Sequence, residues 1–409
     1  MPRLLIINIT CNQGSTGKIS EQVGLMMKQR GWEVYLAHGA RRVNSSALST
    51  IPFSSVKNEY LHALKSLLFD ADGLGSKAAT KRLVDNIIEI KPDIIHIHNL
   101  HGYYLNYQVL FEYLNSTNIP VVMTLHDCWS FTGHCVHFVT ANCERWKTGC
   151  YDCVLNHKPP KRSILLDRSK RNYSLKKKYF SSNRNLHLVA VSNWLEGLVK
   201  QSFLKNNTLQ VIHNGIDINL YKPQHTKSSD KYVILGVSNV WHRDKGLYDI
   251  YRLRELLPAN EYSIILVGLS KKQIQNLPQG IVGIKQTTNQ QELVDLYSEA
   301  NVLINPTYAD TFPTINLEAM ACGTPVVTYN TGGSPESITS KTGIIVKQGD
   351  IEGMASAIRY LRNNPLSSED CRKHAETNFD KDSCFMSYAL LYEKLIMDNQ
   401  YKCDRKLQS

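Results

Sequence analysis

The sequence predicts an α/β protein made of two doubly wound domains, each a parallel sheet covered by helices. The chain of 409 residues is long enough for two domains of ordinary size. Short apolar runs with the length of strands alternate with segments of helical periodicity, a pattern typical of parallel sheets. Near residues 217–232, Pro223 and a polar run interrupt this alternation, which then starts again. We therefore place a domain boundary there.

The first domain, residues 1–217, opens with an apolar strand at residues 4–9. Further strands are predicted at residues 34–37, 93–98, 119–125 and 187–191. The opening run is too short for a signal peptide, and no later run reaches membrane-spanning length. We therefore expect a cytoplasmic protein.

The second domain, residues 218–380, repeats the pattern. Its strands are predicted at residues 232–237, 263–267, 302–304 and 325–329. The chain then regains helical periodicity, which predicts a C-terminal helix within residues 381–409.

The composition indicates a globular protein, with 42% apolar and 20% charged residues. A formal net charge of +11 would suit nucleic-acid binding, but the sequence carries no helix-turn-helix, zinc-finger or RNA-recognition signature. We expect no nucleic-acid partner. The basic excess could instead attract anionic lipid or help to hold diphosphate ligands.

The most informative stretch, residues 310–325, follows the apolar strand at 302–304 and enters a short helix with Pro313 near its first position. A helix start presents unpaired backbone N–H groups, here those of Thr314 and Ile315, which suit a phosphate. Asp310 and Glu318 flank the same turn. Amides that hold an anion, with carboxylates on both sides, fit a ligand that carries phosphates and sugar hydroxyls.

This stretch resembles the signature of glycosyltransferase family 4. The resemblance lies in an acid at position 310, Glu318, and the run Ala-Met-Ala-Cys-Gly-Thr-Pro-Val-Val at residues 319–327. It implies a GT-B fold, with two Rossmann-like domains facing across a cleft and a last helix that crosses back to the first domain. It also implies a retaining, hexosyltransferase-type enzyme without a catalytic metal. The first domain would bind a glycan or lipid-linked acceptor, and the second a UDP- or GDP-sugar, as in enzymes that build bacterial surface polysaccharides.

The resemblance also implies roles for single residues. His126 is similar to the family's active-site histidine, Lys245 to the lysine that holds the diphosphate, and Asp310 to the acid that contacts the transferred sugar. These three are the expected catalytic residues. Glu318 would bind the ribose. The expected donor-binding residues are Gly17, Arg243, Lys245, Asp310, Phe312, Thr314, Ile315 and Glu318.

Two positions depart from the family pattern. Asn239 stands about where most members have an arginine, and Arg243 could compensate because a guanidinium can grip phosphate with two hydrogen bonds. Asp310 replaces the usual glutamate, which keeps the charge and shortens the reach. These departures leave open a non-catalytic subunit that binds sugar nucleotides. A nucleotide-sugar epimerase or a phosphorylase of the same fold is a second alternative, because fold alone does not fix function.

The glycine loop at residues 14–18 is not a Walker-type phosphate loop, because Asn12 and Ile19 occupy two required positions. It either forms a tight turn or, with Gly17, approaches the donor diphosphate. His96, His98 and His101 form a further cluster, to which we assign no catalytic role.

A cysteine-rich insertion spans about residues 128–153. Its Cys150-x2-Cys153 pair is a common half of a structural zinc site, and Cys135 and Cys143 could complete four-coordinate binding. Buried free thiols are the alternative.

Residues 158–178 carry nine Lys or Arg and one acid, Asp167. This basic segment either forms a solvated helix face or rests on an anionic membrane. The second interpretation predicts a peripheral protein on the inner face of the cytoplasmic membrane.

Overall fold

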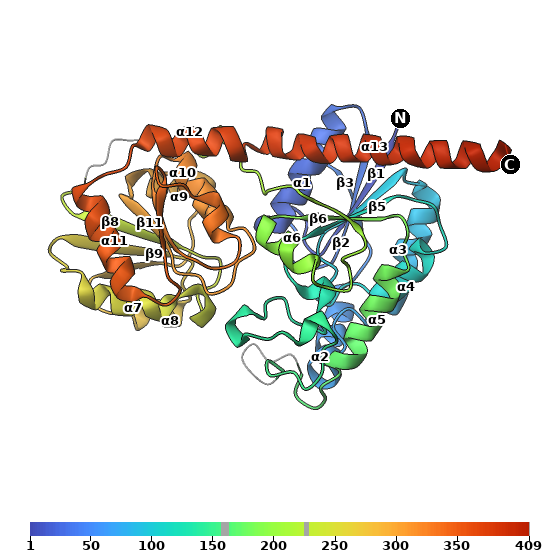
Figure 1. Cartoon of the computed structure of the whole chain (residues 1–409), viewed down its shortest axis with the longest axis horizontal. Helices are drawn as coiled ribbons and strands as arrows, with labels where there is room; N and C mark the ends of the chain where they lie inside the picture. Colours follow the sequence, from blue (N-terminus) through green and yellow to red (C-terminus); the bar gives the residue numbers. More distant parts are fainter. Residues whose placement is uncertain (157–162, 225–228, 409) are drawn as a thin grey trace. The chain divides into compact units, whose positions relative to one another are not determined.

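The computed structural model describes residues 1–156, 163–224 and 229–408, with side chains as far as residue 401. The chain forms two compact units (Figure 1). One unit comprises Met1–Ile212 with Phe385–Ser409, and the other comprises His213–Cys384. The division falls before the predicted boundary at residue 217, because residues 213–217 belong to the second unit and form hydrogen bonds with it. For example, Ile216 N–H donates to the carbonyl of Phe379.

The first unit is built on a seven-stranded parallel sheet with the order β3-β2-β1-β4-β5-β6-β7. Its strands are β1 (Arg3–Asn8), β2 (Glu33–His38), β3 (Ser49–Pro52), β4 (Ile94–Ile97), β5 (Val121–Leu125), β6 (Leu186–Ala190) and β7 (Thr208–Val211). The central strands are almost fully buried, which explains their continuous apolar runs. The strand order reverses between β1 and β4.

Helices connect these strands, and short 3-10 turns lie in the insertion. They are α1 (Gly14–Gln29), α2 (Val56–Phe69), α3 (Lys77–Ile90), α4 (Tyr107–Leu114), η1 (Trp129–Phe131), η2 (Val139–Ala141), η3 (Arg145–Lys147), α5 (Ser169–Ser181) and α6 (Asn193–Val199).

The second unit is built on a six-stranded parallel sheet with the order β10-β9-β8-β11-β12-β13. Its strands are β8 (Tyr232–Val237), β9 (Tyr262–Val267), β10 (Ile281–Ile284), β11 (Val302–Asn305), β12 (Val326–Tyr329) and β13 (Gly343–Val346). The other elements are η4 (Arg243–Lys245), α7 (Leu247–Leu256), α8 (Lys271–Gln275), α9 (Gln290–Glu299), α10 (Thr314–Ala321), η5 (Ser334–Ser337), α11 (Ile351–Asn363) and α12 (Ser368–Phe379). Its order reverses between β8 and β11.

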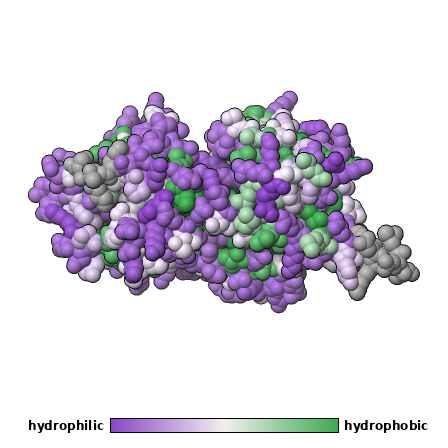
Figure 2. Space-filling view, turned by 90° about the horizontal axis from the view of Figure 1, so that it is seen from above, coloured by the Kyte–Doolittle hydropathy of each residue, from purple (hydrophilic) through white to green (hydrophobic). Residues whose placement is uncertain are grey.

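The last helix, α13 (Lys381–Gln408), begins in the second unit and continues into the first from Phe385 onward. There it buries Tyr388 and Tyr392, and the Tyr392 hydroxyl lies 2.6 Å from His96 Nδ1. In the described part of the chain, no helix is both long and apolar enough to cross a membrane. On the face shown in Figure 2, hydrophilic residues predominate and hydrophobic ones form scattered groups.

The two-domain α/β prediction is confirmed, and every predicted strand is present. Four strands were not predicted: β3, β7, β10 and β13. These are the edge strands of the two sheets. Each is partly exposed. β3 and β7 contain polar residues, and β10 and β13 are apolar but include a glycine, which is uncommon in strands.

Candidate functional site

The carboxyl edge of the second sheet gathers the predicted donor residues. β8 and β11 are hydrogen-bonded neighbours at the point where strand order reverses. Open α/β sheets bind ligands at such a point, beyond the carboxyl ends of the strands. Lys245 follows β8 and Asp310 follows β11. Both therefore lie where a ligand is expected.

Lys245 and Asp310 form an ion pair in which Nζ and Oδ2 are 2.7 Å apart. Their side chains are 30% and 22% exposed, so a ligand can reach both. Lys245 ends the turn η4, and Gly246 then takes φ +75°. A Cβ at Gly246 would collide with the carbonyl oxygen of Pro306, so the turn that positions Lys245 requires glycine.

A second glycine turn fixes Asp310. Gly332 has φ +59°, and a Cβ there would collide with the backbone carbonyl of Asp310. Gly333 N–H donates to that same carbonyl at 3.2 Å. Asp310 Oδ1 accepts the N–H of Phe312 at 3.3 Å, which leaves Oδ2 for Lys245.

The helix beyond Asp310 starts one position later than predicted. Pro313 is the cap residue and not the first helical residue, because its ψ of 117° is extended. Thr314 and Ile315 open α10. A proline side chain offers no acceptor to the first N–H groups of a helix, so the cap residue does not compete with an anion for them. The turn keeps the character of an anion site.

Phe312 is buried inside the second unit. Its side chain is 2% exposed, and its ring stacks on His213 with centroids 4.6 Å apart. Its carbonyl accepts a hydrogen bond from Asn214 Nδ2 at 3.1 Å. The buried ring and the carbonyl of Phe312 therefore anchor the loop that carries Asp310. A contact between Phe312 and the donor stays a prediction.

Glu318 lies on α10 and is partly buried. Its Oε2 accepts the hydroxyl proton of Tyr297 at 2.8 Å, and burial raises the pKa of that tyrosine, with Glu318 adding to the effect. Sequence reasoning missed Asn316, two residues earlier, which is fully buried. Its amide nitrogen donates to Ser334 Oγ and Ser337 Oγ, each at 3.1 Å. Asn316 thus ties α10 to the turn η5, which follows Gly332 and Gly333.

Arg243 and Asn239 are both exposed on the segment between β8 and α7. Arg243 stands two residues before Lys245 on the same turn η4. The structure therefore brings a second cation to this edge of the sheet, and its compensation for Asn239 stays a prediction.

The carboxyl edge of the first sheet has a different chemistry. His126 follows β5, and His98 follows the neighbouring strand β4. Their rings stack with centroids 5.2 Å apart, and His98 Nδ1 lies 2.9 Å from His126 Nε2. Burial lowers the pKa of His126 to about 4 and holds that of His98 well below its usual range. Both imidazoles are therefore neutral at pH 7.

Two further histidines border this pair. Burial lowers the pKa of His96 to about 3, and His96 Nε2 lies 2.8 Å from Thr124 Oγ1. His101 Nε2 lies 2.7 Å from Asp127 Oδ2. Burial opposes both charges, but each partner stabilises the other: the pKa of His101 is raised and that of Asp127 falls to about 2. A charged pair therefore lies next to a neutral one.

Gly17 lies in the first unit, at the end of the first turn of α1. A Cβ there would lie 2.5 Å from Thr10 Oγ1, so glycine lets α1 pack closely against the end of β1. Asn99 Nδ2 donates to Thr16 Oγ1 at 3.3 Å, which links the same helix to the loop after β4. Gly17 is thus at the carboxyl edge of the first sheet, and its contact with the donor stays a prediction.

The predicted cysteine ligands are only partly brought together. Among the described residues, the group of close ligand atoms contains His134, Cys135 and Cys153, and both Cys143 and Cys150 lie outside it. The prediction missed His134 because it considered cysteine spacing alone. A usable signal was present, since His134 directly precedes Cys135.

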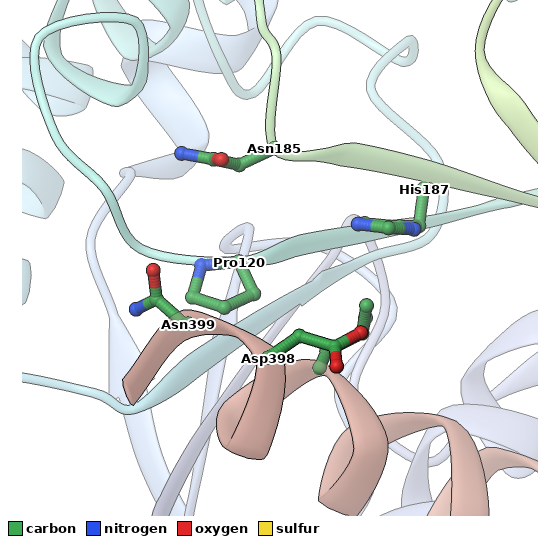
Figure 3. A pocket seen from close by; sticks show the side chains of 6 residues that line it. Pro120, Asn185, His187, Asp398 and Asn399 are labelled. Atoms are coloured by element: carbon green, nitrogen blue, oxygen red, sulfur yellow. The ribbon is translucent and has the colours of Figure 1, made fainter. Parts of the chain in front are cut away.

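A small pocket lies elsewhere in the first unit (Figure 3). It is lined by Pro120, Asn185, His187, Leu395, Asp398 and Asn399. Pro120 and Asn185 directly precede β5 and β6, so the pocket opens at the amino ends of these strands. His126 follows the opposite end of β5. The pocket is therefore not the candidate site.

Two family models match the chain. Residues 22–220 match the model described as Glycosyltransferase Family 4, and residues 217–378 match the model described as Glycosyl transferases group 1. Together the two matches extend over most of both units.

Curated relatives and solved structures agree with this assignment. The chain is 24% identical, over 64% of its length, to the colanic acid biosynthesis glycosyl transferase WcaC of Escherichia coli. It is 23% identical, over 53% of its length, to the capsular polysaccharide biosynthesis glycosyltransferase CapM of Staphylococcus aureus. The matches cover 65% and 63% of those two proteins, somewhat less than two thirds of each.

Anabaena Alr3699/HepE, solved in complex with UDP-glucose, superposes with a TM-score of 0.65 at 16% identity. The superposition covers 96% of this chain and 99% of HepE, which shows that the two share a fold. The same family assignment follows from the two parallel sheets, from the reversal of strand order in each sheet and from the two family models. The chain belongs to glycosyltransferase family 4 and has the GT-B fold.

Proposed function

We propose that this glycosyltransferase moves a hexosyl group, with retention, from a nucleotide-diphosphate sugar to a glycan or lipid-linked acceptor. The observation that carries the proposal is the reachable Lys245–Asp310 pair beside the start of α10. A cation and helix N–H groups suit the diphosphate, and an adjacent carboxylate suits sugar hydroxyls. HepE, which shares the fold, binds UDP-glucose, and this supports a UDP-sugar as donor.

Binding of the donor would break the ion pair between Lys245 and Asp310 and give each side chain a new partner. Without a ligand, Lys245 and Asp310 neutralise each other, and such partly exposed pairs contribute little stability. A diphosphate would take over Lys245, and Arg243 could add a second contact. Asp310, held in place by Phe312 N–H, would then be free to accept sugar hydroxyls. As the glycosidic bond breaks, Lys245 and the N–H groups of Thr314 and Ile315 would stabilise the charge on the leaving diphosphate.

The first unit would supply the acceptor side of the reaction. His126 is neutral at pH 7, so it can offer a hydrogen bond without placing a positive charge beside an oxocarbenium-like centre. The departing phosphate would take the proton of the acceptor hydroxyl on the same face of the sugar. This scheme needs neither a carboxylate nucleophile nor a catalytic metal.

The names of the relatives suggest the biological context. WcaC and CapM are described as enzymes of colanic acid and capsular polysaccharide biosynthesis. We extend this to the present chain and propose that its product belongs to a surface polysaccharide.

The test is a matrix of sugar nucleotides and lipid-linked acceptors, with the product linkage read by NMR. We expect turnover with one UDP- or GDP-sugar and an anomeric configuration equal to that of the donor. An inverted product would overturn retention. Tight donor binding without turnover would favour the non-catalytic binding subunit, and conversion of the donor without acceptor would favour the epimerase.

A surface of the first unit supports a lipid-linked acceptor. Tyr60, Leu61 and Leu64 on α2 are 61%, 58% and 53% exposed. Beside them lie Ile164 and Leu165, both exposed, on a segment joined to α2 by the hydrogen bond from Ile164 N–H to the Leu67 carbonyl at 2.7 Å. Exposed leucines rarely gather without a partner. We call this group the α2 surface.

Exposed cations border the α2 surface. Lys57 and Lys65 lie on α2 itself, and Lys170 lies on α5. The basic segment is not uniformly exposed, because Lys176 is buried and donates to the carbonyl of Trp129 at 2.6 Å. Residues 158–162 of that segment lie outside the described residues. Apolar side chains edged by lysines suit the interface of an anionic membrane.

Co-sedimentation with vesicles tests this surface. Leu61→Asp combined with Leu64→Asp should lower binding to vesicles rich in phosphatidylglycerol by about tenfold. Leu390→Asp is the matched control, because Leu390 is 59% exposed on α13 and lies outside the α2 surface. Equal binding by all three proteins would remove the membrane proposal and leave the transferase proposal standing.

A further inference from the structure

Three ligand atoms of the cysteine-rich insertion converge on one point. His134 Nε2 lies 3.0 Å from Cys153 Sγ, and Cys135 Sγ lies 4.0 Å from the same sulfur. All three atoms are within 4.8 Å of one another. His134 and Cys135 are buried, and Cys153 is partly buried. One imidazole and two thiols of this kind are the ligands that zinc prefers.

The histidine is held in place by a buried carboxylate. Asp70, the capping residue directly after α2, lies 3.0 Å from His134 Nδ1, and the two side chains are only 1% and 2% exposed. Metal-binding histidines usually engage a carboxylate or carbonyl through the second ring nitrogen, which fixes the ring and its tautomer. The contact with Asp70 therefore orients Nε2 toward the two sulfurs.

Distances separate a metal site from a disulfide. The sulfurs of Cys135 and Cys153 are 4.0 Å apart, whereas a disulfide requires about 2.05 Å. Two thiolates bound to one tetrahedral zinc lie about 3.8 Å apart, given Zn–S bonds of about 2.3 Å. The observed spacing thus suits a shared metal better than a bond between the cysteines.

Cys150 is the fourth candidate ligand. Its sulfur accepts the N–H of Gly133 at 3.1 Å, so it lies beside the backbone that carries His134 and Cys135. It also forms the Cys-x2-Cys pair with Cys153, which lets two sulfurs approach one ion. In the described part of the chain, neither Cys150 nor Cys143 belongs to the group of close ligand atoms, and it is the contact with Gly133 that favours Cys150.

We propose that His134, Cys135, Cys150 and Cys153 bind one Zn²⁺ ion, with Asp70 as the carboxylate that orients His134. Four protein ligands leave no position for a substrate, so the ion is structural. It ties the insertion to the end of α2. Cys153 N–H also donates to Asp167, just before α5, so the site joins three separate segments of the first unit.

The site has a consequence for the neighbouring edge of the sheet. The insertion begins directly after His126 and Asp127, and Trp129 N–H donates to Asp127 Oδ1 at 2.8 Å. Lys176 donates to the carbonyls of Trp129 and Thr132. Thr132 Oγ1 in turn donates to the carbonyl of Cys135, which is a proposed ligand. The ion therefore stabilises the segment that leaves the candidate site.

The test is metal analysis of the whole protein purified without added zinc or chelator. We expect about one zinc per chain. Cys153→Ser and His134→Ala should each reduce this to below about a tenth, with increased proteolysis between α2 and α5. Cys143→Ser is the matched control: it changes a cysteine of the same insertion, and it should retain the full metal content.

Three outcomes would overturn the proposal. One is wild-type protein free of metal both as purified and after incubation with Zn²⁺ under reducing conditions. Another is loss of zinc in Cys143→Ser together with its retention in His134→Ala, which would return the site to the four cysteines. The third is a Cys135–Cys153 disulfide found by mass spectrometry of protein prepared under reducing conditions. If a ligand variant does not fold, the metal content of wild type and of Cys143→Ser still decides the matter. Glycosyl transfer is not part of the readout, so the test is independent of the proposed function.

Discussion

The carboxyl edges of the two sheets of this protein carry side chains of different charge. The edge of the second sheet carries an accessible ion pair, Lys245–Asp310, beside the start of a helix. The edge of the first carries stacked imidazoles, His98 and His126, which burial keeps neutral. The strand order reverses at both edges, so topology alone does not separate them. The side chains that follow each strand give the two edges different chemistry.

The difference matches what the two substrates of a glycosyl transfer require. A diphosphate brings negative charge, and a fixed cation with helix N–H groups stabilises that charge. An acceptor hydroxyl and a developing oxocarbenium centre are served better by neutral groups. The following predictions test whether the edge of the second sheet binds the diphosphate and the edge of the first serves the acceptor.

Lys245→Ala should have the largest effect. It removes the cation that would face the diphosphate in the ground state and the leaving group in the transition state, so kcat/KM should fall by about a hundredfold or more. Donor affinity, measured by calorimetry with the UDP-sugar or GDP-sugar that gives turnover, should fall as well. Arg243→Ala is the matched control on the same turn η4 and should cost less than about tenfold. The reverse order would assign the phosphate to Arg243.

Gly332→Ala should disturb the second unit next. Its φ of +59° disfavours any Cβ, and the Cβ would collide with the Asp310 carbonyl, which is backbone and cannot rotate away. We expect a loss of about 2–4 kcal/mol in the free energy of unfolding, together with weaker donor binding.

Gly14→Ala is the control for this change in the first unit. Gly14 has φ +68°, but no described atom lies within 4 Å of the Cβ position, so only backbone strain of roughly 1 kcal/mol is expected. Denaturant unfolding of both variants measures the difference. Equal losses would show that φ alone, and not the contact with Asp310, makes Gly332 necessary.

The same contrast explains what the sequence could predict. Asp310 and Glu318 lie in one short stretch, where a helix start and two acids can be recognised locally. The central strands were predicted because burial on both faces gives them continuous apolar runs. The edge strands β3, β7, β10 and β13 were missed because they are partly exposed and carry polar residues or a glycine within a short run.

The first unit was harder to predict because its contacts join distant segments. His98 and His126 are brought together by the pairing of β4 with β5, and His134 meets Asp70 across the end of α2. Cysteine spacing suggested Cys143 as a ligand, but spacing carries no information on how the insertion folds back. Local sequence signals therefore describe the donor edge well and the first unit only in part.

Acid should destabilise the first unit before the second. The pKa of His126 is about 4 in the folded protein and about 6.5 in an unfolded chain. Between these values the unfolded chain binds more protons, so stability falls as pH decreases from 6.5 to 4. The expected loss from this one group is ~2–3 kcal/mol, and His96, with a pKa of about 3, adds to it.

The neighbouring charges do not reverse this sign. The raised pKa of His101 gives stability that is fully present below pH 6.5, and the lowered pKa of Asp127 gives stability that is lost only below pH 4. Hydrogen exchange should therefore show β4 and β5 losing protection between pH 6.5 and 4, ahead of β11 and β12. Simultaneous loss in both sheets would mean that the imidazoles do not control the acid response.

Asn239→Arg should have the smallest effect, and the only favourable one. Asn239 is exposed on the segment after β8, where most family members have an arginine, so the new side chain needs no repacking. A second exposed cation near the diphosphate should improve donor affinity by about two- to fivefold, equivalent to ~0.5–1 kcal/mol. If Arg243 supplies the cation near the diphosphate in the natural sequence, the gain in donor affinity should be at least twice as large in the Arg243→Ala background. Equal gains in both backgrounds would mean that Arg243 does not compensate, and a loss of affinity would place the diphosphate away from the end of β8.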